Sequence, residues 1–460
     1  MSPVTRRDFL GMMGAAAATA TLPRCGRGAG GDAKKANIVL MLFDNIGYGD
    51  LGCYGNRLVK TPRIDRLAAE GVRCTDFYIA SPSCMPSRGA LLTGRHPLRN
   101  GLNEQIWRID ELEQVGLPRR EIILPRYLRE AGYVTGCFGK WNLGFSPGSR
   151  PTDRGFHEYF GNISGNCDYY TYIYRGRNDL YRNTEPAKAK GYSTYVFADA
   201  ACDFIKRNKD RPFLCYVPFN AAHYPNPKSK APGAPCIWQA PDEAFARYGY
   251  SPQTRDEPSR YRAVITALDN GVGRILDQLD RLDLTRKTIV IALSDNGAFL
   301  IPKRGLECAS NAPLRSGGTT VWEGGIRVPC IVRWPGPTTP GTPCHGPLTS
   351  MDVVPLALRV AGLAPPGDRV LDGRDPTDAL AGRAASPHKC LCWRYGKIGA
   401  AIRMGRYKLI REKDSADQDW QLFDLQSDVG ESVDLRAARP DLARRLEAEY
   451  ARWIKDVKTG

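Results

Sequence analysis

Two short apolar runs are the clearest pattern in the chain. Residues 37–43 read NIVLMLF and are followed by Asp-Asn at 44–45, whereas residues 288–294 read TIVIALS and are followed by Asp-Asn-Gly at 295–297. Continuous apolar runs of this length that end in turn-forming residues are typical of parallel strands buried on both faces. We therefore predict two such strands in one sheet.

Helical spacing of apolar residues separates these runs. Residues 61–71, 124–132 and 261–282 place apolar side chains three and four positions apart, and the first two segments end in glycine. Alternating strands and helices predict an α/β fold, a doubly wound and mostly parallel sheet flanked by helices. Ligands of such sheets bind outside the carboxyl ends of the strands, which is where the polar residues follow each run.

The pattern changes after about residue 373, where strand-like runs become shorter and are separated by turns. Four such runs and a closing amphipathic helix cover residues 390–395, 400–404, 407–410, 421–425 and 440–457. They predict a smaller antiparallel sheet packed against one helix. We expect a C-terminal α+β subdomain over residues 374–460, after a larger α/β domain over residues 33–373.

The first 32 residues have the composition of a targeting segment. Arg6 and Arg7 precede a weakly apolar, alanine-rich stretch at 11–22, a layout typical of a twin-arginine export signal and too short to span a bilayer. A lipid anchor on Cys25 is disfavoured because an arginine precedes it. We expect an export signal at 1–32, a periplasmic or secreted bacterial protein, and no transmembrane segment.

Composition narrows the functional classes. The chain has 460 residues, enough to bury its own core, and a formal net charge of +16. The basic residues are scattered and accompany no nucleic-acid-binding motif, so we expect no nucleic-acid partner, although a basic surface suits a sulfated glycan. The 14 cysteines are irregularly spaced without a CxxC pair. Most are expected to be small buried hydrophobic residues.

The polar pairs after the two strands suit a metal ion. Asp44 with Asn45, and Asp295 with Asn296, supply carboxylate and carboxamide oxygens. Either pair alone is better explained as an Asx turn or a helix cap, but two pairs on neighbouring parallel strands favour a metal site. Hard oxygen ligands suit calcium or magnesium, and calcium fits better because it accepts more ligands and less exact geometry.

A cysteine stands where a helix is expected to begin. Residues 84–88 read CMPSR, in which Pro86 suits a first helical turn and Ser87 can satisfy an orphan amide. A helix N-terminus stabilises a thiolate or a bound oxyanion, and Arg88 can return toward the same point. A buried structural cysteine is the simpler interpretation of Cys84 alone. The metal pairs in the same chain favour a reactive site.

Residues 84–88, continuing through the Leu-Thr-Gly-Arg of 92–95, resemble the signature of the formylglycine-dependent sulfatases, in which the cysteine is oxidised after translation to an aldehyde. The resemblance extends over nearly all of the mature chain and is nearest to arylsulfatase A and N-acetylgalactosamine-6-sulfatase, in the alkaline phosphatase superfamily. Besides the cysteine motif, the matching segments are 38–55 and 294–297 (metal), 139–144 (GKWHLG), 220–223 (substrate histidine) and 323–329 (EGGIRxP).

The resemblance implies a sulfuric ester hydrolase and assigns roles to single residues. Cys84, once converted by a formylglycine-generating enzyme, gives a hydrated aldehyde whose one hydroxyl attacks sulfur and whose other hydroxyl later expels sulfate. Calcium on the two polar pairs and on residue 84, together with Lys140 and Arg88, would stabilise the charge on the sulfate oxygens. His223 would be the general acid that protonates the leaving alcohol.

Three positions depart from the family pattern. Asn45 stands where an aspartate is usual, which weakens metal binding without removing the oxygen ligand. Asn142 replaces the histidine of GKWHLG, and Gly318 stands at the position of a sulfate-binding lysine. Each lost charge-assisted hydrogen bond is expected to slow turnover by about 10²-fold if nothing compensates. We expect Asn142→His together with Gly318→Lys to raise aryl sulfatase activity.

Other residues are candidates for contacting the substrate. Lys303 and Arg304 follow the second metal pair and Arg315 begins the segment that lost the lysine, so each could reach the anion, although a solvated surface cation is the simpler interpretation of any one of them. His157 lies in the family's substrate-loop region and is a candidate sugar contact. With Asn142 they make up the predicted substrate-binding set.

The sequence thus predicts an exported hydrolase that removes sulfate from a sulfated carbohydrate or an aryl sulfate. Two alternatives stay open: a phosphatase or phosphonate hydrolase on the same superfamily fold, and a catalytically degenerate protein that binds sulfated glycans. The intact motif at residues 84–88 argues against binding alone, because a pure binding protein needs no aldehyde precursor.

Overall fold

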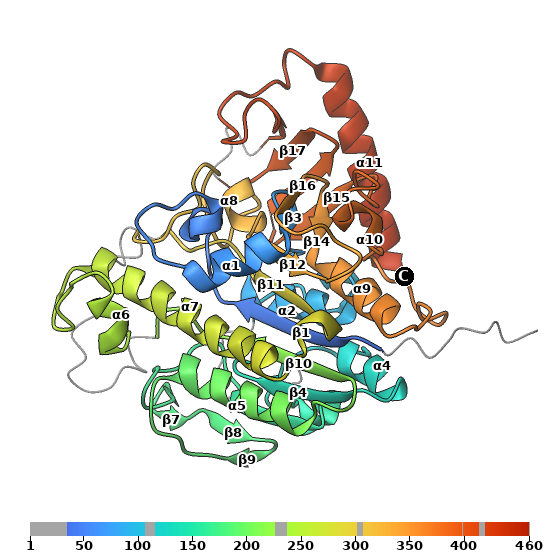
Figure 1. Cartoon of the computed structure of the whole chain (residues 1–460). Coiled ribbons are helices and arrows are strands. Elements are labelled where there is room, and N and C mark those ends of the chain that lie inside the picture. Colours follow the sequence, from blue (N-terminus) through green and yellow to red (C-terminus); the bar gives the residue numbers. More distant parts are fainter. Residues whose placement is uncertain are drawn as a thin grey trace, which may run out of the picture. The chain divides into compact units, whose positions relative to one another are not determined.

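A ten-stranded sheet forms the centre of the computed structural model (Figure 1), with strand order β13-β2-β12-β11-β1-β10-β4-β5-β8-β9. The structure describes residues 35–105, 116–225, 237–300, 307–397, 399–413 and 419–459. Residues Ala36–Gly460 form one compact unit. The domain boundary expected near residue 373 therefore stays a prediction.

Five adjacent strands of this sheet run parallel to one another. In spatial order they are β11 (Thr288–Ser294), β1 (Asn37–Phe43), β10 (Phe213–Pro218), β4 (Val134–Phe138) and β5 (Glu158–Asn162). The two apolar runs of the sequence are β11 and β1, with the predicted bounds. They pair directly in parallel, so the prediction of two neighbouring buried strands is confirmed.

Antiparallel strands extend the sheet at both edges. On one side β12 (Cys330–Arg333) pairs antiparallel with β11 and with β2 (Val72–Cys74), and β13 (Thr342–Cys344) follows. On the other side β8 (Leu180–Arg182) and β9 (Glu185–Pro186) form an antiparallel ribbon on β5. The sheet is therefore mixed at its edges and parallel where its strands are longest.

Helices cover both faces of the sheet because the central strands are apolar on both sides. On β1, Leu40 faces one hydrophobic cluster and Met41 faces the other, and both are fully buried. The first cluster lies under α2 (Cys84–Thr93), α4 (Leu124–Glu130) and α9 (Val353–Val360), and the second lies under α1 (Pro62–Glu70), α5 (Ser193–Arg207) and α7 (Glu257–Arg281). This is the predicted doubly wound arrangement.

The shorter elements lie in the connections. They are β3 (Phe77–Tyr78), β6 (Ile173–Tyr174), β7 (Arg177–Asn178), β14 (Leu348–Thr349), α3 (Pro97–Asn100), α6 (Asp242–Ala246), α8 (Glu323–Ile326) and α10 (Thr377–Leu380). Single 3-10 turns occur at Tyr48–Asp50, Gly52–Tyr54, Thr152–Arg154, Thr285–Lys287 and Ser350–Asp352.

The C-terminal part is the predicted antiparallel sheet with one helix. Strands β15 (Leu391–Tyr395), β16 (Gly399–Met404), β17 (Tyr407–Arg411) and β18 (Gln421–Asp424) pair in sequence order, and α11 (Pro440–Thr459) packs on one face. The other face joins the hydrophobic cluster of the large sheet. The predicted fold class is therefore confirmed.

A buried group of charges joins the C-terminal sheet to the large sheet. Lys408 Nζ of β17 lies 2.9 Å from Glu323 Oε1 of α8 and 2.8 Å from Glu431 Oε1. Arg327, Arg403 and Asp76 lie beside them: Arg327 pairs with both Glu323 and Asp76, and Arg403 pairs with Asp76. We call these six residues the junction cluster. Its three cations and three carboxylates balance.

The cysteines follow the expectation as far as the structure describes the chain. Among the described residues the cysteines are free thiols, and most of them are buried. They therefore pack as small hydrophobic residues. No helix within the described ranges is long and apolar enough to cross a membrane.

Candidate active site

Four neighbouring parallel strands deliver polar side chains to one edge of the sheet. Asp295 follows β11, Asp44 follows β1, His223 follows β10 and Lys140 follows β4. Lys140 Nζ lies 2.5 Å from Asp44 Oδ2. Ligand atoms of Asp44, Cys84 and His223 all lie within 4.8 Å of one another. The carboxyl edge of the sheet thus gathers residues that are far apart in the sequence.

Backbone hydrogen bonds continue the sheet beyond the strands and fix these side chains. Asp44 donates its N–H to Ala221 O at 2.9 Å, and Ala222 donates back to Asp44 O at 2.8 Å. Asp295 donates to Phe43 O at 2.9 Å, and Lys140 donates to Pro218 O at 2.7 Å. Because each site segment bonds to the neighbouring strand end, the site is held by the sheet itself.

Cys84 is the first residue of α2 and is almost completely buried, at 7% exposure. Its Sγ lies 3.7 Å from Asp44 Oδ1 and 3.8 Å from Asn45 Oδ1. Burial raises the pKa of the thiol, which outweighs the lowering by Lys140, and Asp295 and Asp44 raise it further. Burial therefore opposes the thiolate that the helix N-terminus is expected to stabilise.

Helix α2 is anchored at both of its ends. Gln105 Oε1 accepts hydrogen bonds from Met85 N at 3.1 Å and from Ser83 Oγ at 3.3 Å, so it satisfies an amide of the first turn. At the other end Gly94 takes the left-handed conformation that commonly terminates a helix, with φ of 68°. The residue at position 84 is therefore held at a fixed point.

The Arg88 guanidinium pairs with the two carboxylates of the site instead of pointing into free space. Its Nε and one terminal nitrogen lie 2.9 and 2.7 Å from Asp295 Oδ2, and the same terminal nitrogen lies 3.6 Å from Asp44 Oδ2. The other terminal nitrogen donates to Lys140 O at 3.1 Å. All three charged side chains are fully buried. Arg88 thus fixes the spacing of the two aspartates.

The two asparagines leave one side-chain oxygen without a donor. Asn296 donates its side-chain N–H to Asn45 Oδ1 at 2.6 Å, and Asn45 donates its backbone N–H to Asp295 Oδ1 at 3.1 Å. Asn296 Oδ1 and Asn45 Nδ2 are buried without a hydrogen-bond partner among the described residues. A buried acceptor without a donor, beside two carboxylates, is the environment that a hard cation would satisfy.

His223 presents one nitrogen to this site. Its Nδ1 lies 2.7 Å from Tyr224 O, so that nitrogen carries the proton and Nε2 is left for other partners. Burial, together with the neighbouring Lys140 charge, lowers the pKa of the ring to about 3. At about pH 7 the ring is therefore neutral in this arrangement, with its lone pair on Nε2.

Asn142 lies two residues beyond Lys140 and is buried, with a backbone φ of 53° that asparagine tolerates well. Its Nδ2 has no hydrogen-bond partner in the part of the chain that the structure describes. The 164–166 loop runs beside it, since a Cβ at Gly165 would touch Asn142 Oδ1, and Asn166 donates to Tyr224 O beside His223. Asn142 is therefore a neutral donor available near the predicted acid.

Gly318 lies against Phe299. A Cβ at Gly318 would be 2.7 Å from two ring carbons of Phe299 and 2.8 Å from Gly297 O. Contacts below 3.0 Å force neighbouring atoms to move, and a backbone oxygen cannot do so cheaply. The expectation that Gly318→Lys improves the site therefore does not fit this geometry.

Several predicted substrate contacts are not brought to the site. His157 precedes β5, at the amino edge of the parallel strands, where its Nδ1 lies 2.9 Å from Thr135 Oγ1 at β4. Arg315 stacks on Trp322 at 3.6 Å and donates to Glu431 O at 2.8 Å, so its charge belongs beside the junction cluster. Lys303 and Arg304 lie outside the described residues.

Three residues near the site escaped the sequence reasoning. Gln105 anchors α2, but its sequence surroundings resemble no capping motif. Tyr395 of β15 lies beside Ser83 and Cys84, and burial raises the pKa of its hydroxyl. Phe299 contacts the His223 ring edge-on, with centroids 6.2 Å apart. An aromatic residue two positions after the second metal segment is the only sequence signal for Phe299.

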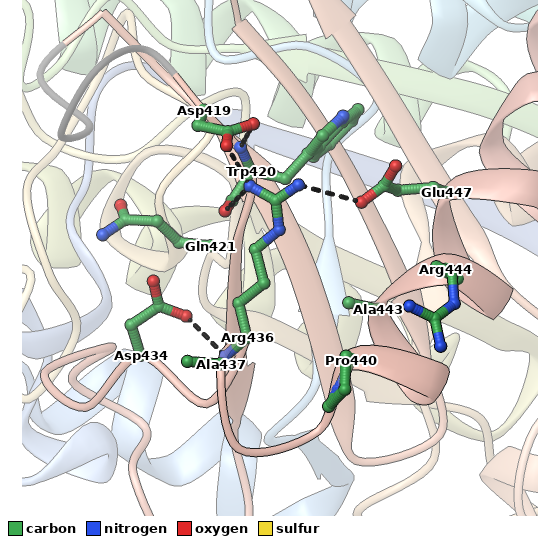
Figure 2. A pocket seen from close by; sticks show the side chains of 10 residues that line it. All are labelled: Asp419, Trp420, Gln421, Asp434, Arg436, Ala437, Pro440, Ala443, Arg444 and Glu447. Carbon is green, nitrogen blue, oxygen red and sulfur yellow. Dashed lines mark hydrogen bonds and ion pairs between the residues drawn. The ribbon is translucent and has the colours of Figure 1, made fainter.

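A separate cavity of about 510 Å³ lies on the C-terminal sheet, between β18 and α11. Figure 2 shows Arg436 at its centre, paired with Asp419 and with Glu447. Trp420 lies beside them, in edge contact with Tyr450. The charge of Arg436 is thus satisfied inside the cavity by two carboxylates, and Gln421 Oε1 in its lining is buried without a hydrogen-bond partner among the described residues.

Comparison with known proteins identifies the family. The Sulfatase family profile matches residues 36–363. The N-acetylgalactosamine-6-sulfatase of Canis lupus familiaris is 38% identical over 84% of this chain and 74% of that protein. The arylsulfatase of Hemicentrotus pulcherrimus is 33% identical over 81% of this chain and 67% of that protein.

Solved structures agree with these sequence matches. The crystal structure of Ps i-CgsB has a TM-score of 0.81 at 30% identity, covering 91% of this chain and 93% of that chain. The fold and the matching relatives define a sulfuric ester hydrolase of the alkaline phosphatase superfamily. The chain belongs to the sulfatase family.

Proposed function

We propose that this protein is an exported sulfatase that hydrolyses a sulfate ester of a carbohydrate, with formylglycine at position 84 and a calcium ion beside it. The observation that carries the proposal is the position of Cys84, at the first residue of a fixed helix and 3.7 Å from Asp44 Oδ1. Support for a carbohydrate comes from the relative named N-acetylgalactosamine-6-sulfatase and from Ps i-CgsB, which was solved with k-i-k-neocarrahexaose.

The residues present fit a divalent cation. Asp44, Asn45, Asp295 and Asn296 are the oxygen-bearing side chains that would hold it, because they converge from two paired strands. The buried Asn296 Oδ1 lacks a donor, and carboxylate and carboxamide oxygens suit calcium better than softer metals. A bound cation would supply positive charge for the sulfate oxygens, and the formylglycine would supply the attacking hydroxyl.

The chain's own side chains divide the remaining work. Arg88 keeps Asp44 and Asp295 in place through its buried ion pairs. Lys140 is a buried cation close to position 84 and can share the charge of a bound sulfate. His223 Nε2 takes up a proton when an anionic substrate raises the pKa of the ring, and passes it to the leaving alcohol oxygen.

The charge balance accounts for two departures from the family pattern together. Asp44 and Asp295 are matched by Arg88 and Lys140 within the buried site. Asn45 removes one negative charge relative to the usual aspartate, and Gly318 removes one positive charge relative to the usual lysine. The two changes cancel, so the net attraction for a sulfate monoanion is preserved.

The test combines mass spectrometry with parallel assays. Protein co-expressed with a formylglycine-generating enzyme should carry the aldehyde or its hydrate at position 84, and Cys84→Ala protein should not. The converted protein should hydrolyse an aryl sulfate or a sulfated glycan more efficiently than the matching phosphate ester. A preference for phosphate would support the phosphatase alternative. Glycan binding without turnover, despite confirmed aldehyde, would support a binding protein.

Export has its own test. The segment that carries Arg6 and Arg7 lies outside the described residues, and its layout alone supports twin-arginine export. Full-length protein in a bacterial host should reach the periplasm, whereas Arg6→Lys with Arg7→Lys should remain in the cytoplasm. Equal periplasmic yields would contradict this route.

A further inference from the structure

Phe299 occupies the side of the site next to the predicted acid. Its ring meets the His223 ring at 75° with centroids 6.2 Å apart, and it lies against the Cα of Gly318. The side chain is only partly buried, whereas Asp295 and Asn296 just before it are buried. A partly exposed aromatic ring therefore borders the acid on one side and reaches solvent on the other.

The backbone before Phe299 is clamped, so the ring has a defined position. Asn311 accepts from Ala298 N at 3.0 Å and donates to Ala298 O at 2.9 Å. Gly318 N donates to the same oxygen at 2.9 Å. Asn311 also donates to Ser316 O at 3.0 Å, which ties the two loops together. Such preorganisation is what a binding surface requires, because little entropy is lost when a ligand docks.

We propose that Phe299 is a specificity-determining residue that packs against the ring of the leaving alcohol, not against the sulfate. The inference rests on the proposed function, in which His223 protonates the leaving oxygen. A benzene ring offers no charge-assisted hydrogen bond to a sulfate, but it offers a flat apolar face to the C–H side of a pyranose or to an aryl ring. The atoms bonded to the leaving oxygen lie beside His223 and so reach Phe299.

The absence of a side chain at Gly318 belongs to the same arrangement. A Cβ there would overlap the ring, so Phe299 can lie flat on the loop only because residue 318 is glycine. The chain has therefore placed an apolar surface where a side chain from residue 318 would otherwise project. The contact with the leaving-group ring contributes binding energy to the substrate, not the charge stabilisation that a cation would supply to the sulfate.

The experiment separates contact with the leaving group from contact with sulfate. Formylglycine-containing wild type, Phe299→Ala, Phe299→Tyr and Leu300→Ala are assayed with para-nitrophenyl sulfate and N-acetylgalactosamine 6-sulfate, and inorganic sulfate is measured as a competitive inhibitor. Leu300 is a matched control because it is the next residue, apolar and 39% exposed. Thermal unfolding of each variant verifies that it is folded.

Phe299→Ala should raise KM at least about 5-fold with kcat changed less than about 3-fold, because a contact made equally in ground and transition states is lost. Inhibition by inorganic sulfate should change less than about 2-fold, since sulfate carries no leaving group. Phe299→Tyr should retain wild-type KM, and Leu300→Ala should resemble wild type. If KM of Phe299→Ala rises for both esters, Phe299 packs against aryl and sugar rings alike. If KM rises for one ester only, Phe299 is specific for the ring of that ester.

Three outcomes would overturn the inference. The first is an unchanged KM of Phe299→Ala for both esters. The second is a loss of inhibition by inorganic sulfate in Phe299→Ala as large as the rise in KM. The third is a rise in KM of Leu300→Ala equal to that of Phe299→Ala. Failure of the proposed function is distinguishable, because there the wild type itself would hydrolyse neither ester despite confirmed formylglycine. If Phe299→Ala does not fold, Phe299→Leu keeps the apolar volume without the flat ring and should give the same rise in KM.

Discussion

Two buried groups of charged residues in this protein each contain as many cations as carboxylates, but they differ in whether the polar atoms around the charges have hydrogen-bond partners. The junction cluster pairs three carboxylates with three cations, and Lys408 alone lies within 2.9 Å of two carboxylates. At the candidate site Asp44 and Asp295 are likewise matched by two cations, Arg88 and Lys140. Net charge therefore does not distinguish the two groups.

The difference lies in the neutral polar groups around the charges. Beside the paired aspartates, Asn45 Nδ2 and Asn296 Oδ1 are buried without partners, and so is Asn142 Nδ2, as far as the described residues extend. Each buried polar group that is left unpaired costs about 1–3 kcal/mol of stability. Such groups are expected where a bound ligand will satisfy them. The junction cluster, whose charges are paired, therefore has a structural role and is the joint between the two sheets. The group around Asp44 and Asp295 keeps unpaired polar atoms, which indicates a binding site, and we call it the incomplete cluster.

The largest expected effect comes from removing a carboxylate from the incomplete cluster. Asp295→Ala frees Arg88 and removes a proposed cation ligand, so turnover of any sulfate ester should fall by at least about 10³-fold. Steady-state kinetics on protein with confirmed formylglycine is the measurement. Asp199→Ala, which removes an exposed partner of Arg274, is the control and should keep wild-type rates. Retained activity in Asp295→Ala would exclude it from the site.

The next largest effect concerns the junction cluster. Lys408→Met leaves Glu323 and Glu431 facing each other in the interior, which should lower the free energy of unfolding by about 3–5 kcal/mol. The control is Lys389→Met, which breaks an exposed pair with Glu449 and should cost less than about 1 kcal/mol. Chemical denaturation measures both. Equal small losses would mean that the junction cluster contributes no more than a surface pair.

Much of the fold was predictable because the strongest signals are local. Both β1 and β11 were predicted with their observed bounds, since each is an uninterrupted apolar run between turns. Helix α7 begins four residues before the predicted start, where Asp256 accepts from Ser259 N and Pro258 occupies the first turn. This capping signal lies outside the apolar spacing and extends the helix toward its N-terminus.

The sequence predicted which residues form the site better than it predicted what each of them contacts. Motifs named Cys84, Lys140 and His223, but the engagement of Arg88 with two carboxylates depends on long-range contacts that spacing does not encode. His157 was misassigned because it directly precedes β5, and the start of a parallel strand lies at the edge opposite the ligands. The contact of Phe299 with Gly318 joins two loops that no local pattern relates.

A smaller effect should follow from adding charge to the incomplete cluster. Asn45 has a backbone φ of 59°, which aspartate also tolerates. Asn45→Asp adds a second formal charge beside Asp44 and should tighten calcium binding by about 10-fold. The added negative charge should lower kcat/KM for sulfate esters at saturating calcium. Calorimetric titration measures the first effect, and an unchanged affinity would exclude Asn45 as a ligand.

The smallest effect is a pH dependence that arises in the joint. Burial and the neighbouring Glu323 carboxylate raise the pKa of Glu431 to about 7, against a usual value near 4.5. The folded protein thus holds a proton that the unfolded chain releases, so this contribution to stability is complete below about pH 4.5 and is lost as pH rises through about 7. Glu431→Gln should flatten the decline in Tm over this range, while an unaltered profile would contradict the assignment.

The most direct test of the comparison is the shift in Tm on adding calcium to chelator-treated protein. Wild type should gain several degrees, because a ligand that binds only the folded state stabilises it by mass action. Lys408→Met, or Glu431→Gln if the former is too unstable, should start from its own Tm and gain as much, whereas Asp295→Ala should gain nothing. An undiminished shift in Asp295→Ala, or a shift abolished by changing the joint instead, would contradict the assignment of the incomplete cluster as the cation site.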